Sequence, residues 1–343
     1  MGEILVGDAR ETLATLPAES IHCCVTSPPY WGLRDYGEPG QLGLEPTPEE
    51  YVQRLVGIFR EVRRVLRGDG TLWLNLGDSY ATSGVAGPQR DASGGLGGGR
   101  DLGTRGEHGS SITSAGINRA IPRGLKPKDL VGIPWRVAFA LQADGWYLRS
   151  DIIWSKPNPM PESVTDRPTK AHEYLFLLSR SPRYFYDADA VREASDATGP
   201  TWEERKAAGE PVRHGLASAA ACGAGGFAAN PAGRNRRSVW TIATQPFPGA
   251  HFAVMPPALV RPCILAGCPV GGVVLDPFAG AGTVPLVAAE NGRGYLGIEL
   301  NPEYAEMARE RIRLRGKTPV ADEVEPGQES LFPLPDPVVS TRS

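Results

Sequence analysis

The chain has 343 residues, a formal net charge of −3 and a hydrophobic content of 41%. This length predicts about two structural units, or one large α/β domain with insertions. No uninterrupted apolar run is long enough for a membrane span, because Arg261, Pro262 and Pro269 break the most apolar stretch (residues 257–275), so we expect a cytoplasmic protein with no membrane partner. The five cysteines form neither a CxxC pair nor a histidine-flanked cluster, which argues against a disulfide framework and a zinc site, and we expect no bound metal.

The first regular elements alternate between strand and helix. The β-branched run from Ile21 to Thr26 stops at two prolines, which predicts a buried parallel strand that ends in a loop. A capping threonine, a proline at the first helical position and a glutamate predict a helix from Thr47, which Gly68 and Gly70 end. Thr71 to Leu76 is the next predicted strand. This order favours a parallel sheet with right-handed crossovers.

Two irregular tracts interrupt the pattern. Residues 83–124 are rich in Gly, Ser and Arg, and residues 195–237 are rich in Ala and Gly with scattered basic residues. The first tract buries too little apolar surface to order itself, so we expect a mobile loop there. Between them the sequence predicts a helix around Pro134 to Ala143 and strands at Tyr147 to Trp154 and Glu173 to Leu178.

The C-terminal part is regular again. The patterns predict a strand at Val273 to Leu275, a helix at Thr283 to Glu290, a strand at Tyr295 to Ile298 and a helix at Pro302 to Leu314. They form one more β-α-β-α unit. The tail beyond about Lys317 is rich in proline and acidic residues, and we expect it to be disordered.

The segment from Asp276 to Thr283 has the features of a ligand-binding turn. An acid at a strand end, followed by Gly280 and Gly282, lets a ligand lie against the backbone at a helix N-terminus. Glu299 ends the next strand, from where a carboxylate can hydrogen-bond both hydroxyls of a ribose, so the pattern predicts an adenosyl ligand. A dinucleotide site would need a third glycine where Pro285 stands; a purely structural glycine turn is the other alternative.

A second motif runs from Thr26 to Trp31, directly after the first strand. The Ser27 hydroxyl and the Pro28 carbonyl can accept both N–H bonds of an exocyclic amine, which would aim the nitrogen lone pair at a methyl donor. Pro28 and Pro29 stiffen this loop. Tyr30 offers a ring face to a base taken out of a DNA helix, with Trp31 as a second stacking candidate. The alternative is a turn with a packed tyrosine.

Together these motifs resemble those of DNA amino-methyltransferases of the circularly permuted, beta type, which act on N4 of cytosine or N6 of adenine. The resemblance extends from about Gly7 to Arg315, without the two irregular tracts, and Met255 stands where phenylalanine is expected. The similar segments are Gly7-Asp8 with Leu16 to Ile21, Thr26 to Trp31, Trp154 to Asn158, Asp166 to Thr169, His172 to Tyr174, His251 to Pro256, Asp276 to Thr283 and Gly297 to Pro302.

This resemblance implies an α/β, Rossmann-like methyltransferase fold, circularly permuted, with a mostly parallel seven-stranded sheet, helices on both faces and inserted loop-rich target-recognition segments. The catalytic residues that it implies are Ser27, Pro28, Pro29 and Tyr30. The implied contacts to the cofactor S-adenosylmethionine are Asp8, Thr26, Asp276, Phe278, Gly280, Gly282, Thr283, Glu299 and Asn301. The candidate substrate contacts are Trp31, Lys156, Arg167, His172 and Glu173.

We accordingly expect two halves of one domain with two insertions. The catalytic half comprises residues 1–82 and 126–194, the mobile Gly/Arg-rich insertion 83–125, the variable insertion that is a candidate for target recognition 195–240, the cofactor-binding half 241–316 and the disordered acidic tail 317–343. Basic residues outnumber acidic ones in residues 84–136 and 201–237, so both insertions could bind phosphates; solvated loop charge is the alternative.

The expected reaction is methyl transfer from S-adenosylmethionine to an exocyclic amine of a flipped DNA base. Serine at position 27 favours N4 of cytosine, and N6 of adenine is the alternative. An RNA or protein-glutamine methyltransferase is a less compatible alternative, because the catalytic half precedes the cofactor-binding half in this chain. A non-catalytic DNA-binding protein is also less compatible, because the motif for the methyl donor (Asp276 to Thr283) is intact. The expected partners are double-stranded DNA and a cognate restriction endonuclease; a monomer and a homodimer are both open.

Overall fold

The computed structural model describes residues 2–33, 37–81, 124–194, 207–208, 233–245 and 254–314. Its strands are β1 (Gly2–Val6), β2 (Ile21–Thr26), β3 (Leu66–Leu76), β4 (Tyr147–Ser155), β5 (His172–Ser179), β6 (Val239–Thr241), β7 (Val273–Asp276) and β8 (Gly294–Glu299). Its helices are α1 (Ala9–Thr15), α2 (Pro48–Val65), α3 (Ile133–Ala143), α5 (Pro257–Gly267), α6 (Thr283–Glu290) and α7 (Pro302–Arg313), with a short 3-10 turn, η1 (Asp189–Val191).

The strands form one sheet in the order β1-β8-β7-β2-β3-β5-β4-β6. Neighbouring strands are parallel except at β5, which runs antiparallel to both β3 and β4. The expected α/β architecture is therefore confirmed, with one correction: the described part of the sheet has eight strands rather than seven. The short β6 pairs with β4 at one edge, where Trp240 lies opposite Trp154, and three residues are too few to show strand periodicity in a sequence.

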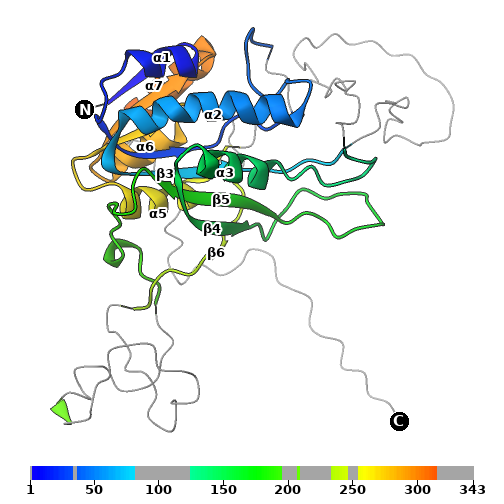
Figure 1. The fold of residues 1–343 in the computed structure, drawn as a ribbon. Coiled ribbons are helices and arrows are strands. Elements are labelled where there is room, and N and C mark those ends of the chain that lie inside the picture. Colours follow the sequence, from blue (N-terminus) through cyan, green and yellow to red (C-terminus); the bar gives the residue numbers. More distant parts are fainter. Residues whose placement is uncertain are drawn as a thin grey trace, which may run out of the picture.

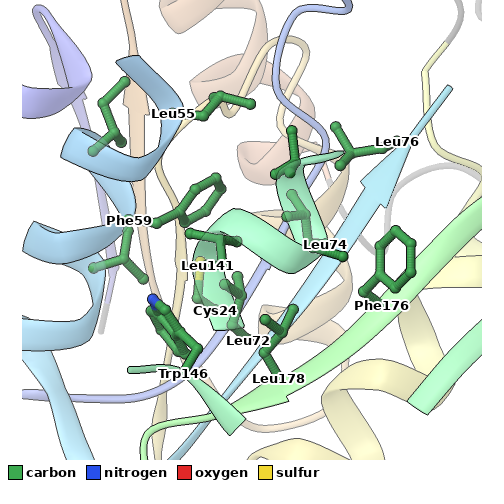
Figure 2. Close-up of a cluster of buried hydrophobic side chains, with 14 of the residues drawn as sticks. Cys24, Leu55, Phe59, Leu72, Leu74, Leu76, Leu141, Trp146, Phe176 and Leu178 are labelled. Carbon is green, nitrogen blue, oxygen red and sulfur yellow. The ribbon is translucent and has the colours of Figure 1, made fainter. Parts of the chain in front are cut away.

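Helices cover both faces of this sheet (Figure 1). The side chains of α1, α2 and α3 pack in one core cluster, and those of α5 and α6 pack in a second cluster on the opposite face. Alternation along β2 sends Cys24 into the first cluster and Cys23 and Val25 into the second. In Figure 2, Phe59 and Leu141 from the helices lie close to the strand side chains of the first cluster. The central strands are therefore buried on both faces, as parallel strands usually are.

The start of α2 follows the sequence prediction, and its end does not. Thr47 Oγ1 accepts a hydrogen bond from Glu50 N at 3.2 Å, and Pro48 is the first helical residue. The helix ends at Val65, before Gly68 and Gly70, because β3 begins at once with Leu66. The two glycines therefore belong to the strand.

The elements β1, α1, β6 and α5 were not predicted from the sequence. Helix α5 is the clearest case, because Pro262 lies inside it and proline removes a backbone donor. Its Val260 and Ile264 are fully buried, so packing against the sheet compensates for the unfavourable proline. No helix among the described residues is long and apolar enough to cross a lipid bilayer.

Most of both expected insertions and the whole expected tail lie outside the described residues. Of the insertion 83–125 the structure describes 124–125, and of the insertion 195–240 it describes 207–208 and 233–240. The expected divisions of the chain therefore stay predictions.

Candidate functional site

The two sequence motifs meet at the carboxyl ends of two central strands of the sheet. The first follows the carboxyl end of β2 and the second that of β7, and these parallel strands are neighbours, with Cys24 opposite Leu275. A cavity of about 310 Å³ opens there, as expected at the carboxyl ends of parallel strands. Its wall includes Asp8, Ser27, Pro28, Pro29, Tyr30, Asn75, Lys156, Glu173, Asp276, Phe278, Gly280, Thr283, Glu299 and Asn301.

A buried hydrogen bond joins the motifs directly. Thr26 Oγ1 donates to Asp276 Oδ1 at 2.7 Å, and Phe278 N donates to the same oxygen at 3.1 Å. Burial raises the pKa of Asp276 to about 7, against the opposing effect of these two hydrogen bonds. Thr26 itself is fully buried and is not part of the cavity wall. It orients the Asp276 side chain at the cavity.

The glycine-rich turn is held by the carboxylate of Glu299. Gly280 N donates to Glu299 Oε2 at 2.7 Å and Asn301 N donates to Oε1 at 2.9 Å. Burial raises the pKa of Glu299, and the backbone donors oppose this rise. Gly280 has φ +48°, and a Cβ built on it would meet no atom within 4 Å. The backbone is therefore open to the cavity here.

Two residues of the donor motif serve the packing of helices. Gly282 has φ +76°, and a Cβ on it would lie 2.7 Å from Ala308 Cβ of α7. Gly282 is absent from the cavity wall. Thr283 does line the cavity, but its hydroxyl oxygen accepts a hydrogen bond from Arg311 Nη1 at 2.9 Å.

Asp8 and Asn301 line the cavity while they cap helices. Asp8 Oδ1 accepts hydrogen bonds from Arg10 N and Glu11 N at 2.9 and 3.1 Å, at the start of α1. The side-chain oxygen of Asn301 caps α7 in the same way, and its Nδ2 donates to Glu38 Oε1 at 2.9 Å. Each helix start is thus fixed next to the cavity.

The loop from Ser27 to Trp31, which we call the transfer loop, is anchored to α2 and to the loop before it. Tyr51 Oη donates to the carbonyl oxygen of Pro29 at 2.8 Å, and Trp31 Nε1 donates to that of Glu45 at 3.0 Å. Trp31 is only 5% exposed and packs in the core. The structure therefore places it behind the loop and away from the cavity wall.

Tyr30 stands at the centre of a polar network. Its hydroxyl donates to Glu173 Oε2 at 2.7 Å, lies 3.0 Å from Asn75 Oδ1 and accepts a hydrogen bond from Ser27 Oγ at 3.3 Å. Lys156 Nζ forms an ion pair with Glu173 Oε1. Burial, and then the negative charge of Glu173, raise the pKa of Tyr30 well above its usual value.

Sequence reasoning missed two residues of this network. Asn75 is 1% exposed and donates through Nδ2 to the carbonyl oxygen of Tyr174 at 3.1 Å. Gly77 packs under the ring of Tyr30, where a Cβ would lie 2.4 Å from Cε2. The signal for Asn75 was a polar residue within the apolar run of β3; the need for glycine at position 77 had no such signal.

The structure does not bring Arg167 and His172 to the cavity wall. Arg167 forms an ion pair with Glu162 at 2.7 Å, and its guanidinium lies 3.9 Å from the centroid of the Tyr80 ring. His172 lies edge-on to Tyr174, with ring centroids 5.3 Å apart. Lys156 and Glu173 do line the cavity, so the five candidate substrate contacts divide into two at the wall and three away from it.

The cavity suits a ligand that carries hydroxyl and positively charged groups. The carboxylates of Asp276, which is buried, and of Glu299, which is half-buried, are acceptors, and the open backbone at Gly280 leaves room for a ligand. Across the described ranges, no group of three or more side chains is arranged to hold a metal ion.

Comparison with known proteins identifies similar chains over most of this length. A family model for N6/N4 methyltransferases, described as DNA methylase, matches residues 21–310. The type II methyltransferase M.Cfr9I of Citrobacter freundii is 50% identical over 307 residues, which are 90% of this chain and 86% of that protein. M.SmaI of Serratia marcescens is 48% identical over 313 residues, which are 91% of each chain.

Solved structures are similar as well. TTHA0409 of Thermus thermophilus, solved in complex with S-adenosyl-L-methionine, has 25% identity and a TM-score of 0.53, over 91% of this chain and 93% of that one. The cytosine-N4-specific PvuII DNA methyltransferase has a TM-score of 0.57, over 90% of this chain and 86% of that one. At 19% identity, the second likeness concerns the fold alone.

Proposed function

Because the chain belongs to the N6/N4 family of DNA methylases, we propose that it transfers the methyl group of S-adenosylmethionine to N4 of a cytosine in double-stranded DNA. One observation carries this proposal: the candidate donor-binding turn and the candidate amine-binding loop line the same cavity. Serine at position 27 supports cytosine as the target base, because its hydroxyl is the acceptor more common in the cytosine enzymes that this motif resembles.

The donor half of the cavity would hold the cofactor, which supplies a methyl group attached to a positively charged sulfur. Glu299 accepts hydrogen bonds from the ribose hydroxyls, and Asp8 accepts one from the adenine amine. Phe278 flanks the adenosine, and Gly280 leaves space for the methionine part. Asp276 presents a carboxylate to the charged end of the cofactor. These roles are supported by the position of each residue on one cavity wall.

The other half would hold the flipped base. Ser27 Oγ and the Pro28 carbonyl accept the two N–H bonds of the amine, so its lone pair points at the methyl group. The ring of Tyr30 stacks on the base, and Lys156 and Glu173 lie within the same wall. Trp31 supports this loop from the core rather than stacking on the base itself.

The DNA backbone would be bound by the basic segments of residues 84–136 and 201–237, which lie mostly outside the described residues. Residues 195–240 are the proposed target-recognition segment. Because similar chains are type II methyltransferases, a cognate restriction endonuclease and a cytoplasmic location are part of the proposal.

Expression in a host without DNA methylation, followed by single-molecule sequencing of its DNA, tests this function. We expect N4-methylcytosine at one short sequence, and no mark when Ser27→Ala replaces the wild type. An N6-methyladenine mark would overturn the assignment of the base, while a folded, cofactor-binding protein that leaves no mark on DNA would overturn the function.

A further inference from the structure

We propose that Tyr30 and Glu173 form a proton path, which carries the proton released by the methylated amine from Ser27 to a carboxylate. This inference rests on the proposed function of the transfer loop. It gives the Tyr30 hydroxyl a task that is separate from the stacking of its ring.

The path is continuous in the structure. Ser27 Oγ lies 3.3 Å from Tyr30 Oη, which lies 2.7 Å from Glu173 Oε2. Tyr30 has a single hydroxyl hydrogen, and Glu173 is a nearer acceptor than Asn75 at 3.0 Å and also the charged one. Lys156 holds the other carboxylate oxygen of Glu173, so that Oε2 faces the tyrosine.

The bonds formed and broken in the reaction balance along this path. The amine nitrogen forms a bond to the methyl carbon as the sulfur–carbon bond of the donor breaks, and the nitrogen then carries one proton too many. That proton moves to Ser27 Oγ, the serine proton moves to Tyr30 Oη, and the tyrosine proton moves to Glu173 Oε2. Ser27 and Tyr30 end the step as they began it, and Glu173 ends it neutral, to return its proton to solvent when the products leave.

The surroundings of Tyr30 suit a group that passes a proton on. Burial raises the pKa of its hydroxyl well above the usual value, so the hydroxyl stays protonated and does not hold a negative charge of its own. The backbone of the loop is fixed by the hydrogen bond from Tyr51 to Pro29, and Gly77 lets the ring lie close to β3. The distances along the path are therefore set before a base arrives.

Conservative variants separate the path from the stacking role. Tyr30→Phe keeps the ring and removes the relay, and Glu173→Gln keeps the shape and removes the final acceptor. We expect each to slow single-turnover methylation of a duplex by about 100-fold, to abolish the solvent deuterium isotope effect, and to leave cofactor binding by calorimetry unchanged. The double variant should be no slower than either single one, because both remove the same path.

Base extrusion is followed in the same samples by the fluorescence of 2-aminopurine placed beside the target cytosine. We expect both conservative variants to keep the wild-type signal, whereas Tyr30→Ala loses it. Tyr184→Phe and Glu61→Gln are matched controls away from the cavity, and they should keep the wild-type rate and isotope effect.

Three results would overturn the proton path. A wild-type rate in Tyr30→Phe with an inactive Tyr30→Ala would leave stacking and the proposed function standing without the relay. Loss of the extrusion signal in Glu173→Gln would make this residue a base contact. Wild-type rates in all Tyr30 variants would remove the proposed role of the transfer loop as well as the path.

Discussion

Asp276 is a buried carboxylic acid at the cavity, and its pKa of about 7 makes the free energy of unfolding depend on pH. The native state keeps the proton to higher pH than the unfolded chain, whose ordinary value is 3.8. Stability is therefore unaffected below that value, falls as the pH rises toward 7 and stays reduced above it, by at most about 4 kcal/mol. Above about pH 7 the protein therefore carries a buried, charged carboxylate at this cavity.

We predict that Asp276→Asn raises the melting temperature at pH 8. Both hydrogen bonds to this side chain end on Oδ1, so an amide oxygen can accept them, while the buried charge is gone. The gain should shrink as the pH is lowered toward 5, where the wild-type carboxyl is itself protonated. Thermal unfolding at both pH values measures this, and an equal gain at both would show that ionisation is not its cause.

At the scale of the element, hydrophobic pattern and end signals predicted the central units well. The strand Ile21–Thr26 and the helix Thr283–Glu290 have the bounds that the sequence predicts. The missing elements, β1, α1, β6 and α5, are short or carry a proline, and only their tertiary contacts make them stable. Local signals do not contain those contacts.

The site was predictable to the same extent. Because each motif directly follows a predicted parallel strand, the sequence places Ser27, Tyr30, Asp276 and Glu299 at the carboxyl ends of the strands. These residues do line one cavity. The direction of a side chain is set by neighbours that are distant in sequence, so Trp31 could not be assigned to the core from the motif alone. Gly77 was missed for the same reason, whereas Asn75 did have a local signal, a polar residue within an apolar strand.

The close contact between the start of α6 and the middle of α7 gives a prediction at this scale. Gly282 and Gly271 have nearly the same φ, +76° and +77°, but a Cβ on Gly282 would meet Ala308 of α7, whereas a Cβ on Gly271 would meet no atom within 4 Å. Gly282→Ala should therefore lower the melting temperature clearly more than Gly271→Ala, which carries the backbone strain of about 1 kcal/mol alone. Equal losses in thermal unfolding would mean that the contact with Ala308 relaxes without cost.

At the scale of the whole molecule, the start of β1 and the end of α7 lie where a crossover would join them. β1 is parallel to its neighbour β8, and α7 returns from β8 toward the start of β1. Arg309 Nη2 of α7 donates to the carbonyl oxygen of Ile4 at 2.8 Å, and Figure 1 shows the N-terminus beside α7. A covalent link from α7 to β1 would thus complete a β-α-β unit of the usual kind.

We predict that an artificial permutation keeps the fold and cofactor binding. Leu314 is joined to Gly2 by about ten Gly and Ser residues, which span about 17 Å on average, and the chain is opened between residues 208 and 233. The donor half then comes first in the chain. Cofactor affinity by calorimetry should stay within about threefold of the wild type; loss of binding in a folded permutant would show that chain order matters to the site.

The hydrogen bond between Thr26 and Asp276 has a consequence for how such a protein can evolve. It lies between adjacent central strands, so the ends of β2 and β7 that carry the two motifs are joined directly. Substitutions or exchanges in segments that touch neither motif would leave this link intact. A gene for such a chain could therefore vary those segments in small steps while the two motifs keep their places.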